Sequence, residues 1–274
     1  MGPHLTWCGP ISCHYTARMT TKACPWRRDD TPSDGHTWVR LGAIPDLVLL
    51  VGVTGVGKTT ALAALDTTTK RYSLLPDRRV LTDEVIIGAR SAVGPLTREE
   101  RFELTARYRE THPGGMAEVL GRILVIPDGA TVVFDGLRGA QEVEYALEYF
   151  PKARFLVLEA PDTLRVRRLL GRNDAFDRGK ARDSGSLEGD LGSLEGAAEV
   201  FGEEGLQELA GLPSQGFRAA DVLDKAGIVL AERRSYDPAA ARRVLEKRAA
   251  RRTLFLDTAA LNERQVSARV AEWA

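Results

Sequence analysis

Short apolar runs alternate with longer amphipathic stretches along most of this chain, and the alternation predicts an α/β fold. Four apolar runs have the length of buried strands, at 47–51, 131–134, 154–158 and 253–257. Each is followed by a stretch that favours a helix, at 61–65, 141–150, 162–170 and 262–273. Strands and helices that alternate at this spacing form right-handed βαβ units. We therefore expect a parallel, doubly wound central sheet in a three-layer αβα sandwich.

The pattern between the first two of these units is weaker. Residues 71–75 and 80–82 are candidates for short strand or edge segments. Residues 97–110 predict a helix, because Thr97 and Glu100 form a capping box ahead of apolar positions. A second helix is expected at 116–123, and a basic helix at 238–251.

Two segments depart from the α/β pattern. Residues 1–40 show no helical or alternating period, and we expect a disordered extension, with structure starting near Val39 and Met19 as a candidate natural start. Removing residues 1–38 should leave stability and ATP affinity nearly unchanged. The composition shifts to Gly, Ser, Glu and Leu over about 179–216, and we expect residues 179–237 to form a flexible, lid-type insertion with one weak helix at 197–209. The folded domain is thus expected over 41–274.

Composition narrows the class of protein. The chain has 274 residues, 43% of them hydrophobic, which is enough for one sizeable core. Lys plus Arg and Asp plus Glu both number 38, and this zero net charge argues against a nucleic-acid partner. No apolar run approaches the roughly 20 residues of a membrane span, and no signal peptide opens the chain.

Cysteine usage points to a reducing compartment. Cys8, Cys13 and Cys24 all lie in the N-terminal stretch, so the expected core is free of cysteine, as in a cytoplasmic protein. Together with His4 and His14 they match no paired zinc-binding spacing. A cytoplasmic location without a zinc site is the expectation.

One segment carries a strong chemical signal. The strand at 47–51 leads into Gly52-Val53-Thr54-Gly55-Val56-Gly57-Lys58-Thr59-Thr60, which fits the G-x-x-x-x-G-K-[ST] phosphate-binding loop at every position. The glycines let several N–H groups converge on phosphate oxygens, and the following helix adds its positive dipole end. Lys58 would reach the β- and γ-phosphates, and the Thr59 hydroxyl would hold Mg²⁺. The chain is therefore expected to bind ATP with Mg²⁺.

A second motif is consistent with the phosphate-binding loop. Val132-Val133-Phe134-Asp135 is an apolar strand that delivers a carboxylate at its carboxyl end, the edge of an α/β sheet where ligands collect. This matches a Walker B strand, and Asp135 would hold Mg²⁺ directly or through water. The alternative is that Asp135 merely forms a turn.

Two further motifs carry a resemblance to a known family. Asp135-Gly136-Leu137-Arg138 resembles the D-G-x-R element of adenylate kinase-like and dephospho-coenzyme A kinase-like enzymes, and Arg168-Leu169-Leu170-Gly171-Arg172 resembles the R-L-x-x-R that opens their lid. The chain thus looks like a P-loop NTPase of the nucleoside/nucleotide-kinase branch over 46–178 and 238–274. The resemblance implies that Arg138 faces the acceptor and that lid arginines assist transfer.

The catalytic residues expected from these motifs are Lys58, Asp135, Arg138, Arg168 and Arg172. Arg168 and Arg172 share one helix face, four residues apart, although a solvated basic face is an equal interpretation. A carboxylate near a hydroxyl acceptor is also expected in a kinase. Asp77 and Asp83 are weak candidates for it, and capping is at least as good an account of each. His112 is another weak candidate for substrate contact.

Three functions remain open at this point. The first is a small-molecule or nucleotide kinase that moves the γ-phosphate of Mg-ATP to an unidentified acceptor. The second is an ATPase whose hydrolysis drives a switch or a partner, and the third, a nucleic-acid end kinase, is disfavoured by the net charge. There is no N-K-x-D segment of a GTPase and no L-S-G-G-Q-like signature of a transporter ATPase. The chain after Asp135 looks too short for the helical second domain of an AAA+ motor.

Overall fold

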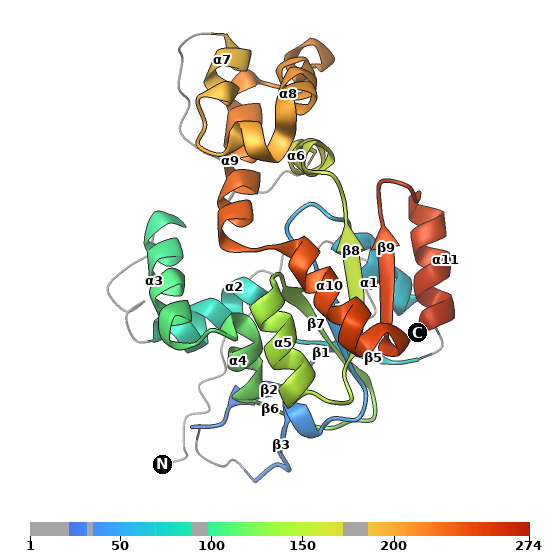
Figure 1. Cartoon of the computed structure of the whole chain (residues 1–274). Helices are drawn as coiled ribbons and strands as arrows, with labels where there is room; N and C mark the ends of the chain where they lie inside the picture. Colours follow the sequence, from blue (N-terminus) through green and yellow to red (C-terminus); the bar gives the residue numbers. More distant parts are fainter. Residues whose placement is uncertain (1–21, 32–34, 69, 89–97, 172–185) are drawn as a thin grey trace, which may run out of the picture.

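A six-stranded parallel sheet forms the centre of the molecule (Figure 1). The computed structural model describes residues 22–31, 35–68, 70–88, 98–171 and 186–274. Every neighbouring pair of strands is parallel. In spatial order the strands are β1 Lys22–Ala23, β5 Tyr72–Leu74, β7 Thr131–Leu137, β4 Leu47–Val51, β8 Arg154–Glu159 and β9 Thr253–Asp257. All five residues of the inner strand β4 are buried, and the phosphate-binding sequence leaves from its carboxyl end.

Helices cover both faces of the sheet, and two hydrophobic clusters lie beneath them. One face carries α1 Lys58–Asp66 and α11 Glu263–Trp273, which contact each other. The other carries α4 Gly115–Gly121, α5 Ala140–Tyr149 and α10 Pro238–Ala249 (Figure 1). The expected αβα sandwich with a parallel sheet is confirmed.

The region that follows β5 is helical. Residues 80–82, a candidate edge segment, instead form the end of α2 Arg78–Leu81 and the start of a π-helical turn over Thr82–Ile87. The reason is a cap, because the Asp77 side chain accepts a hydrogen bond from Val80 N at 2.9 Å and starts the helix. The expected helix at 97–110 is observed as α3 Arg98–Thr111, and its expected capping residue lies outside the described residues.

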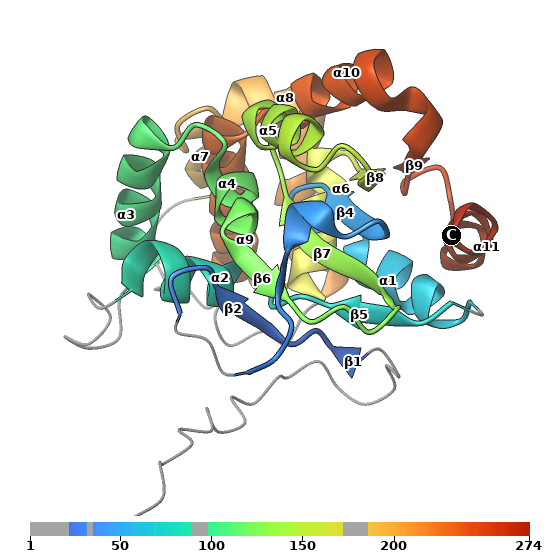
Figure 2. The same cartoon turned by 90° about the horizontal axis from the view of Figure 1, so that it is seen from below.

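Ordered structure begins earlier than the sequence pattern predicts. Residues 22–31 lie within the expected disordered extension, yet β1 pairs with β5 of the central sheet and Cys24 is buried in the core. A small antiparallel sheet adds β2 Trp26–Arg28, β6 Ile123–Val125 and β3 Val39–Arg40, in that order. Figure 2 shows β2 beside β6. Segments this short show no readable period, and only their pairing with distant strands defines them. Residues 1–21 lie outside the described residues.

The expected flexible insertion contains a packed helical unit. Its members, α7 Leu187–Gly192, α8 Ala197–Ala210 and α9 Ala219–Ser235, stand above the sheet in Figure 1 and enclose a third hydrophobic cluster with α6 Asp162–Leu170. The helix expected at 197–209 is α8, but α7 and α9 were not anticipated. The chain thus carries a helical unit beyond Asp135, contrary to the argument from its length. Short 3-10 turns occur at Leu41–Ala43, Leu212–Gln215 and Ala250–Arg252.

Candidate active site

The loop between β4 and α1 has a backbone that its glycines make possible. Gly52 has φ of 158°, and a Cβ there would lie 2.8 Å from both Leu158 O and a Val56 methyl. Gly57 caps α1 in the left-handed region, with φ of 93°. Val53 and Val56 are buried in the hydrophobic cluster beneath α1. The loop is therefore anchored by its apolar residues and shaped by its glycines.

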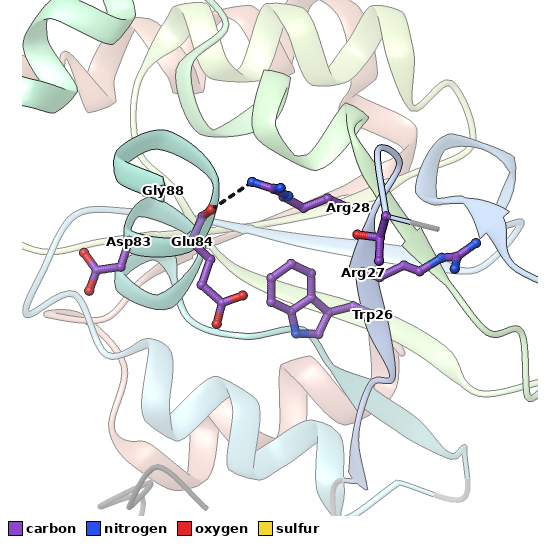
Figure 3. A pocket seen from close by; sticks show the side chains of 7 residues that line it. Trp26, Arg27, Arg28, Asp83, Glu84 and Gly88 are labelled. Atoms are coloured by element: carbon purple, nitrogen blue, oxygen red, sulfur yellow. Dashed lines mark hydrogen bonds between the residues drawn. The ribbon is translucent and has the colours of Figure 1, made fainter. Parts of the chain in front are cut away.

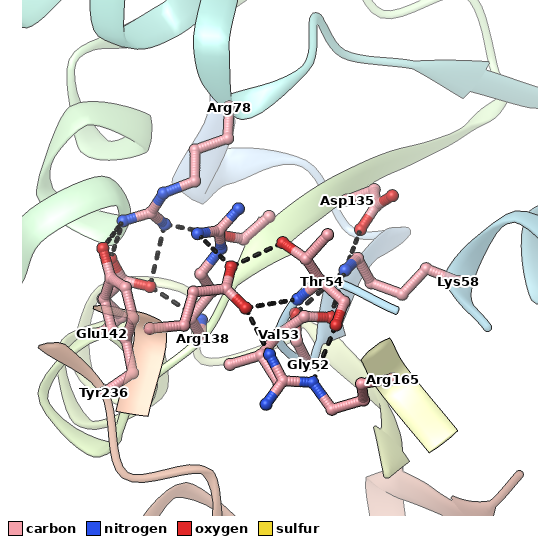
Figure 4. A network of polar contacts seen from close by, with 12 residues as sticks. Gly52, Val53, Thr54, Lys58, Arg78, Asp135, Arg138, Glu142, Arg165 and Tyr236 are labelled. Carbon is pink, nitrogen blue, oxygen red and sulfur yellow. Dashed lines mark hydrogen bonds and ion pairs between the residues drawn. The ribbon is translucent and has the colours of Figure 1, made fainter. Parts of the chain in front are cut away.

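Lys58 lies over this loop. Its Nζ donates to Gly52 O at 3.0 Å and to Val53 O at 2.9 Å, and it lies 3.8 Å from Asp135 Oδ1 (Figure 4). Asp135 stands on β7 opposite Leu50 of β4, the strand that leads into the loop, and Lys58 is the first residue of α1 after the loop. The structure thus brings together the lysine and the carboxylate that the sequence predicts for one site.

Thr59 and Asp135 form a donor set suited to Mg²⁺. Thr59 is the second residue of α1 and is exposed, and Asp135 supplies a carboxylate from the neighbouring strand. Mg²⁺ prefers oxygen ligands and is usually held by one or two protein oxygens together with substrate phosphates and waters. The residues present therefore fit this ion. In the described part of the chain, no cluster of three or more His, Cys, Asp or Glu residues forms a separate metal site.

Arg138 follows β7 and is held by two buried carboxylates. Its Nη1 lies 2.7 Å from Glu232 Oε1, and its backbone N–H donates to Glu142 Oε2 at 2.8 Å. Glu142, in the first turn of α5, also receives a fork from Arg78 at 2.6 and 3.0 Å (Figure 4). Arg138 thus belongs to a polar network that starts beside the loop and continues into the region after β5.

Glu142 and Arg78 form a buried ion pair within this network. Burial raises the pKa of Glu142, but the Arg78 guanidinium and the N–H groups of Arg138 and Met116 outweigh burial and hold that pKa below its ordinary value. For Arg78, burial lowers the pKa. The negative charge of Glu142 and the Tyr236 hydroxyl outweigh burial, so the pKa of Arg78 lies above its ordinary value. Both partners of the pair therefore stay ionised.

Three arginines surround one aromatic ring in this network. The guanidinium carbons of Arg109, Arg78 and Arg138 lie 5.1, 5.4 and 5.7 Å from the centre of the Tyr236 ring. The Tyr236 hydroxyl accepts a hydrogen bond from Arg78 at 2.9 Å. One basic and aromatic surface is thus built by segments far apart in the sequence: α2, α3, the residue after β7 and the segment after α9.

The remaining arginines divide into three cases. Arg168 donates to Gly55 O at 3.2 Å and to Thr258 O at 2.7 Å, contacts that brace the loop against the segment after β9. Arg172 lies outside the described residues. Arg165, which the sequence did not single out, is fully buried, and its Nε donates to Thr54 O at 2.8 Å.

The weak candidates for a catalytic base have other contacts. Asp77 caps α2 through Val80, and Asp83 forms an ion pair with Arg101 of α3. His112 stacks on Tyr108 with ring centres 4.0 Å apart, and its Nδ1 lies 3.1 Å from Tyr108 O. A helix cap, an ion pair and ring stacking account for these three side chains in the structure.

Two cavities border these elements. One, of 510 Å³, lies between β2 and the π-helical turn, lined by Trp26, Arg27, Arg28, Thr31, Asp83, Glu84 and Gly88 (Figure 3). Arg28 closes one side by donating to Glu84 O at 3.4 Å. The other, of 270 Å³, reaches Val53 and Val56 of the loop and is also lined by Arg233 and Arg242. Only the second touches the phosphate-binding loop.

Several residues of this site could not be found by reading motifs. Glu142, Glu232, Arg78 and Tyr236 lie in segments without a recognisable signature, and Glu232 is 178 residues from its partner Thr54. Arg165 is the exception, because the sequence gives a clue to it. It lies one turn before Arg168 on the same helix, α6.

A phosphate-binding loop between a buried strand and a helix, with a lysine and a carboxylate converging on it, in a parallel αβα sandwich, defines a P-loop NTPase. A family model described as an AAA domain matches residues 48–185, just over half of the chain. The chain belongs to this AAA domain family. The match covers β4, the loop, β7, β8 and α6, so it includes the predicted residues Lys58, Asp135, Arg138 and Arg168.

Solved structures with a similar arrangement include two kinases. A sugar kinase from Janibacter sp. HTCC2649 is 16% identical, covers 83% of this chain and 93% of its own, and has a TM-score of 0.33. A gluconokinase from Sinorhizobium meliloti 1021 is 14% identical, covers 84% and 94%, and has a TM-score of 0.36. Likenesses of this size assign no activity to the chain.

No curated protein sequence matches the chain. Within the described ranges, no helix has both the length and the apolar character that crossing a bilayer requires.

Proposed function

We propose that this chain is an ATP-dependent phosphotransferase that moves the γ-phosphate of Mg-ATP to a small-molecule or nucleotide acceptor. Phosphoryl transfer depends on neutralising charge and on in-line positioning more than on covalent chemistry. Lys58 supplies a positive charge at the loop, within 3.8 Å of Asp135. Thr59 and Asp135 would hold Mg²⁺, which neutralises charge on phosphate oxygens when it is bound.

The acceptor side is supported by the arginines around Tyr236. Arg138 is only 23% exposed, is oriented by Glu232 and contributes to the same surface as Arg78 and Arg109. Hydrolysis by water does not require a basic and aromatic surface next to the phosphate-binding loop. A second, anionic or hydroxylated substrate would use it, since guanidinium groups suit bidentate contact with phosphate or carboxylate. This surface is the observation that carries the proposal.

An ATPase that drives a switch or a partner is the second candidate. It is favoured by the helical unit α7–α9, because Glu232 of α9 contacts Thr54 of the loop directly. A unit joined to the loop in this way can respond to nucleotide. The AAA domain family match is compatible with either activity.

One experiment separates the two candidates. Purified protein is incubated with ATP and Mg²⁺, with and without a library of metabolites and nucleotides, and ADP release is followed. Release that depends strongly on one class of acceptor, with a phosphorylated product, supports the kinase. Equal release without any acceptor supports the ATPase and contradicts the proposal.

A further inference from the structure

Glu232 brings a buried carboxylate from the helical unit to the phosphate-binding loop. It lies in the last turn of α9, and its side chain is 3% exposed. Glu232 Oε2 accepts from Thr54 N at 3.0 Å, and Oε1 accepts from Thr54 Oγ1 at 2.5 Å. Arg138 and Arg165 pair with the same carboxylate. One side chain thus joins α9, the loop, the segment after β7 and α6.

Arg165 also bonds to the backbone of Thr54. Its Nε donates to Thr54 O at 2.8 Å (Figure 4). Its remaining nitrogens pair with Asp162 and Glu232. Asp162 in turn pairs with Arg233 of α9 at 2.7 Å. The N–H, the carbonyl and the hydroxyl of Thr54 are therefore all bonded to side chains of α6 and α9. These bonds restrain a glycine-rich loop, which has little conformational preference of its own.

The carboxylate stays charged in this setting. Burial raises the pKa of Glu232, but Arg138, Arg165, the Thr54 hydroxyl and Lys58 together hold it below its ordinary value. An ionised carboxylate is only an acceptor, so both oxygens are committed to the loop and the two arginines. Hydrogen bonds to a charged partner are about twice as strong as neutral ones.

Glu232 bonds to the loop at Thr54, near the start of the loop, whereas phosphate is expected to bind near its end. Thr54 lies four residues ahead of Lys58, where α1 begins. Phosphates bind at the turn that leads into such a helix, through its N-terminal N–H groups. The position of Glu232 therefore suits a role in supporting the loop, and the end of the loop that binds phosphate stays available to the ligand.

We propose that Glu232 is a positioning residue, which holds the phosphate-binding loop through Thr54 in the conformation that receives nucleotide phosphates and makes nucleotide affinity depend on the helical unit α7–α9. A loop that is already held in its binding conformation loses less conformational freedom when the ligand arrives. The inference rests on the proposed function only in that the ligand of the loop is a nucleotide.

The test compares wild type with Glu232→Gln, which keeps the length of the side chain and removes its charge. Mg-ADP affinity is measured by calorimetry, and amide hydrogen exchange is measured on the peptide that contains Thr54. The matched control is Glu208→Gln, which breaks a carboxylate–arginine pair at 3.0 Å on the exposed side of the same unit, with Arg167. Thr54→Val, of nearly equal shape, removes the hydroxyl contact from the loop side in case Glu232→Gln does not fold.

Glu232→Gln is expected to weaken Mg-ADP binding about tenfold and to speed exchange at the loop, in line with losing a bond to a charged group. Thr54→Val should shift both quantities in the same direction by less, and the control should match wild type. Unchanged exchange at the loop, unchanged affinity or tighter binding by Glu232→Gln would overturn the inference, and tighter binding would mean that Glu232 competes with phosphate. Wild type that binds no Mg-ADP would contradict the proposed function, while the exchange result would still decide the role of Glu232.

Discussion

Arg138 is the residue at which the donor loop and the proposed acceptor surface meet. Its side chain pairs with Glu232, which holds the loop, and it lies over the ring of Tyr236, which belongs to the acceptor surface. Its backbone N–H is fixed by Glu142. The position of Arg138 is therefore fixed by both carboxylates, and a small displacement of either one should move the Arg138 side chain.

Arg138→Ala is expected to impair acceptor use far more than ATP binding. A lost charge-assisted contact costs about 1.5–3 kcal/mol, which corresponds to roughly one to two orders of magnitude in the acceptor constant or the rate. ATP affinity should barely change, because the loop and Lys58 hold the nucleotide. Steady-state kinetics with each substrate varied in turn measure the two effects separately.

The control for this variant is Arg243→Ala, which removes an exposed arginine of α10 whose pair with Asp237 spans 3.6 Å. It should leave all constants near wild type. A collapse of ATP affinity in Arg138→Ala with normal acceptor dependence would place Arg138 in the donor site and contradict the proposed geometry.

At the scale of elements, the N-terminal strands are where sequence and structure differ in a way that can be measured. Residues 22–28 contribute β1 to the central sheet and β2 to the small sheet, and Trp26 packs against the core beside Cys24. The sequence pattern alone predicts that this segment is dispensable. The structure predicts that it is not.

A chain that starts at residue 32 should melt at a lower temperature than one that starts at residue 22. Burying an apolar side chain is worth about 1.5–3 kcal/mol, so losing two gives a fall of at least about 5 °C for a domain of this size. Thermal unfolding followed by circular dichroism compares the two truncated chains. Equal melting temperatures would mean that β1 and β2 add nothing to stability.

Periodicity predicted the elements whose residues bury a whole face. The strands β4, β7, β8 and β9 and the helices α5, α6 and α11 match the expected ranges closely, because each packs an apolar run or stripe against the sheet. The two- and three-residue strands are too short to show a period. The helices α7 and α9 were hidden because Gly, Ser and Asp in the insertion mask apolar residues that pack within the helical unit and against α6.

The residues of the site also divide into those that the sequence predicts and those that it does not. Lys58, Thr59 and Asp135 could be predicted because their roles are encoded in contiguous motifs. Glu142 and Glu232 act through partners 64 and 178 residues away, and no local pattern announces such pairs. Their carboxylates could be recognised only after the fold had brought α2, α5 and α9 beside the loop.

At the scale of the whole molecule, the two buried carboxylates link stability to pH. The pKa of Glu142 and that of Glu232 both lie below the ordinary value of 4.5, because burial, which raises them, is outweighed by the arginines and N–H groups around them. The unfolded chain therefore binds more protons than the folded chain at acidic pH. Their stabilisation is fully present above about pH 4.5 and is lost as the pH falls through the lower folded values.

The melting temperature of the wild type should therefore decline as the pH falls below about 4.5, and Glu142→Gln should show a shallower decline from a lower starting value. Removing this charge leaves Arg78 buried without its partner, which typically costs about 3–5 kcal/mol. Unfolding curves recorded between pH 7 and pH 3 measure both effects. A Glu142→Gln profile that runs parallel to the wild type at every pH would show that Glu142 does not contribute to the linkage.

The account depends above all on the loop as the site of nucleotide turnover, and Lys58→Ala tests this most directly. Lys58 is partly exposed, and its Nζ donates to two loop carbonyls and lies 3.8 Å from Asp135, so its removal should leave the fold intact. Consumption of Mg-ATP by wild type and by Lys58→Ala is measured beside their melting temperatures. The account predicts that turnover is abolished while the melting temperature stays close to wild type; undiminished turnover by Lys58→Ala would contradict it.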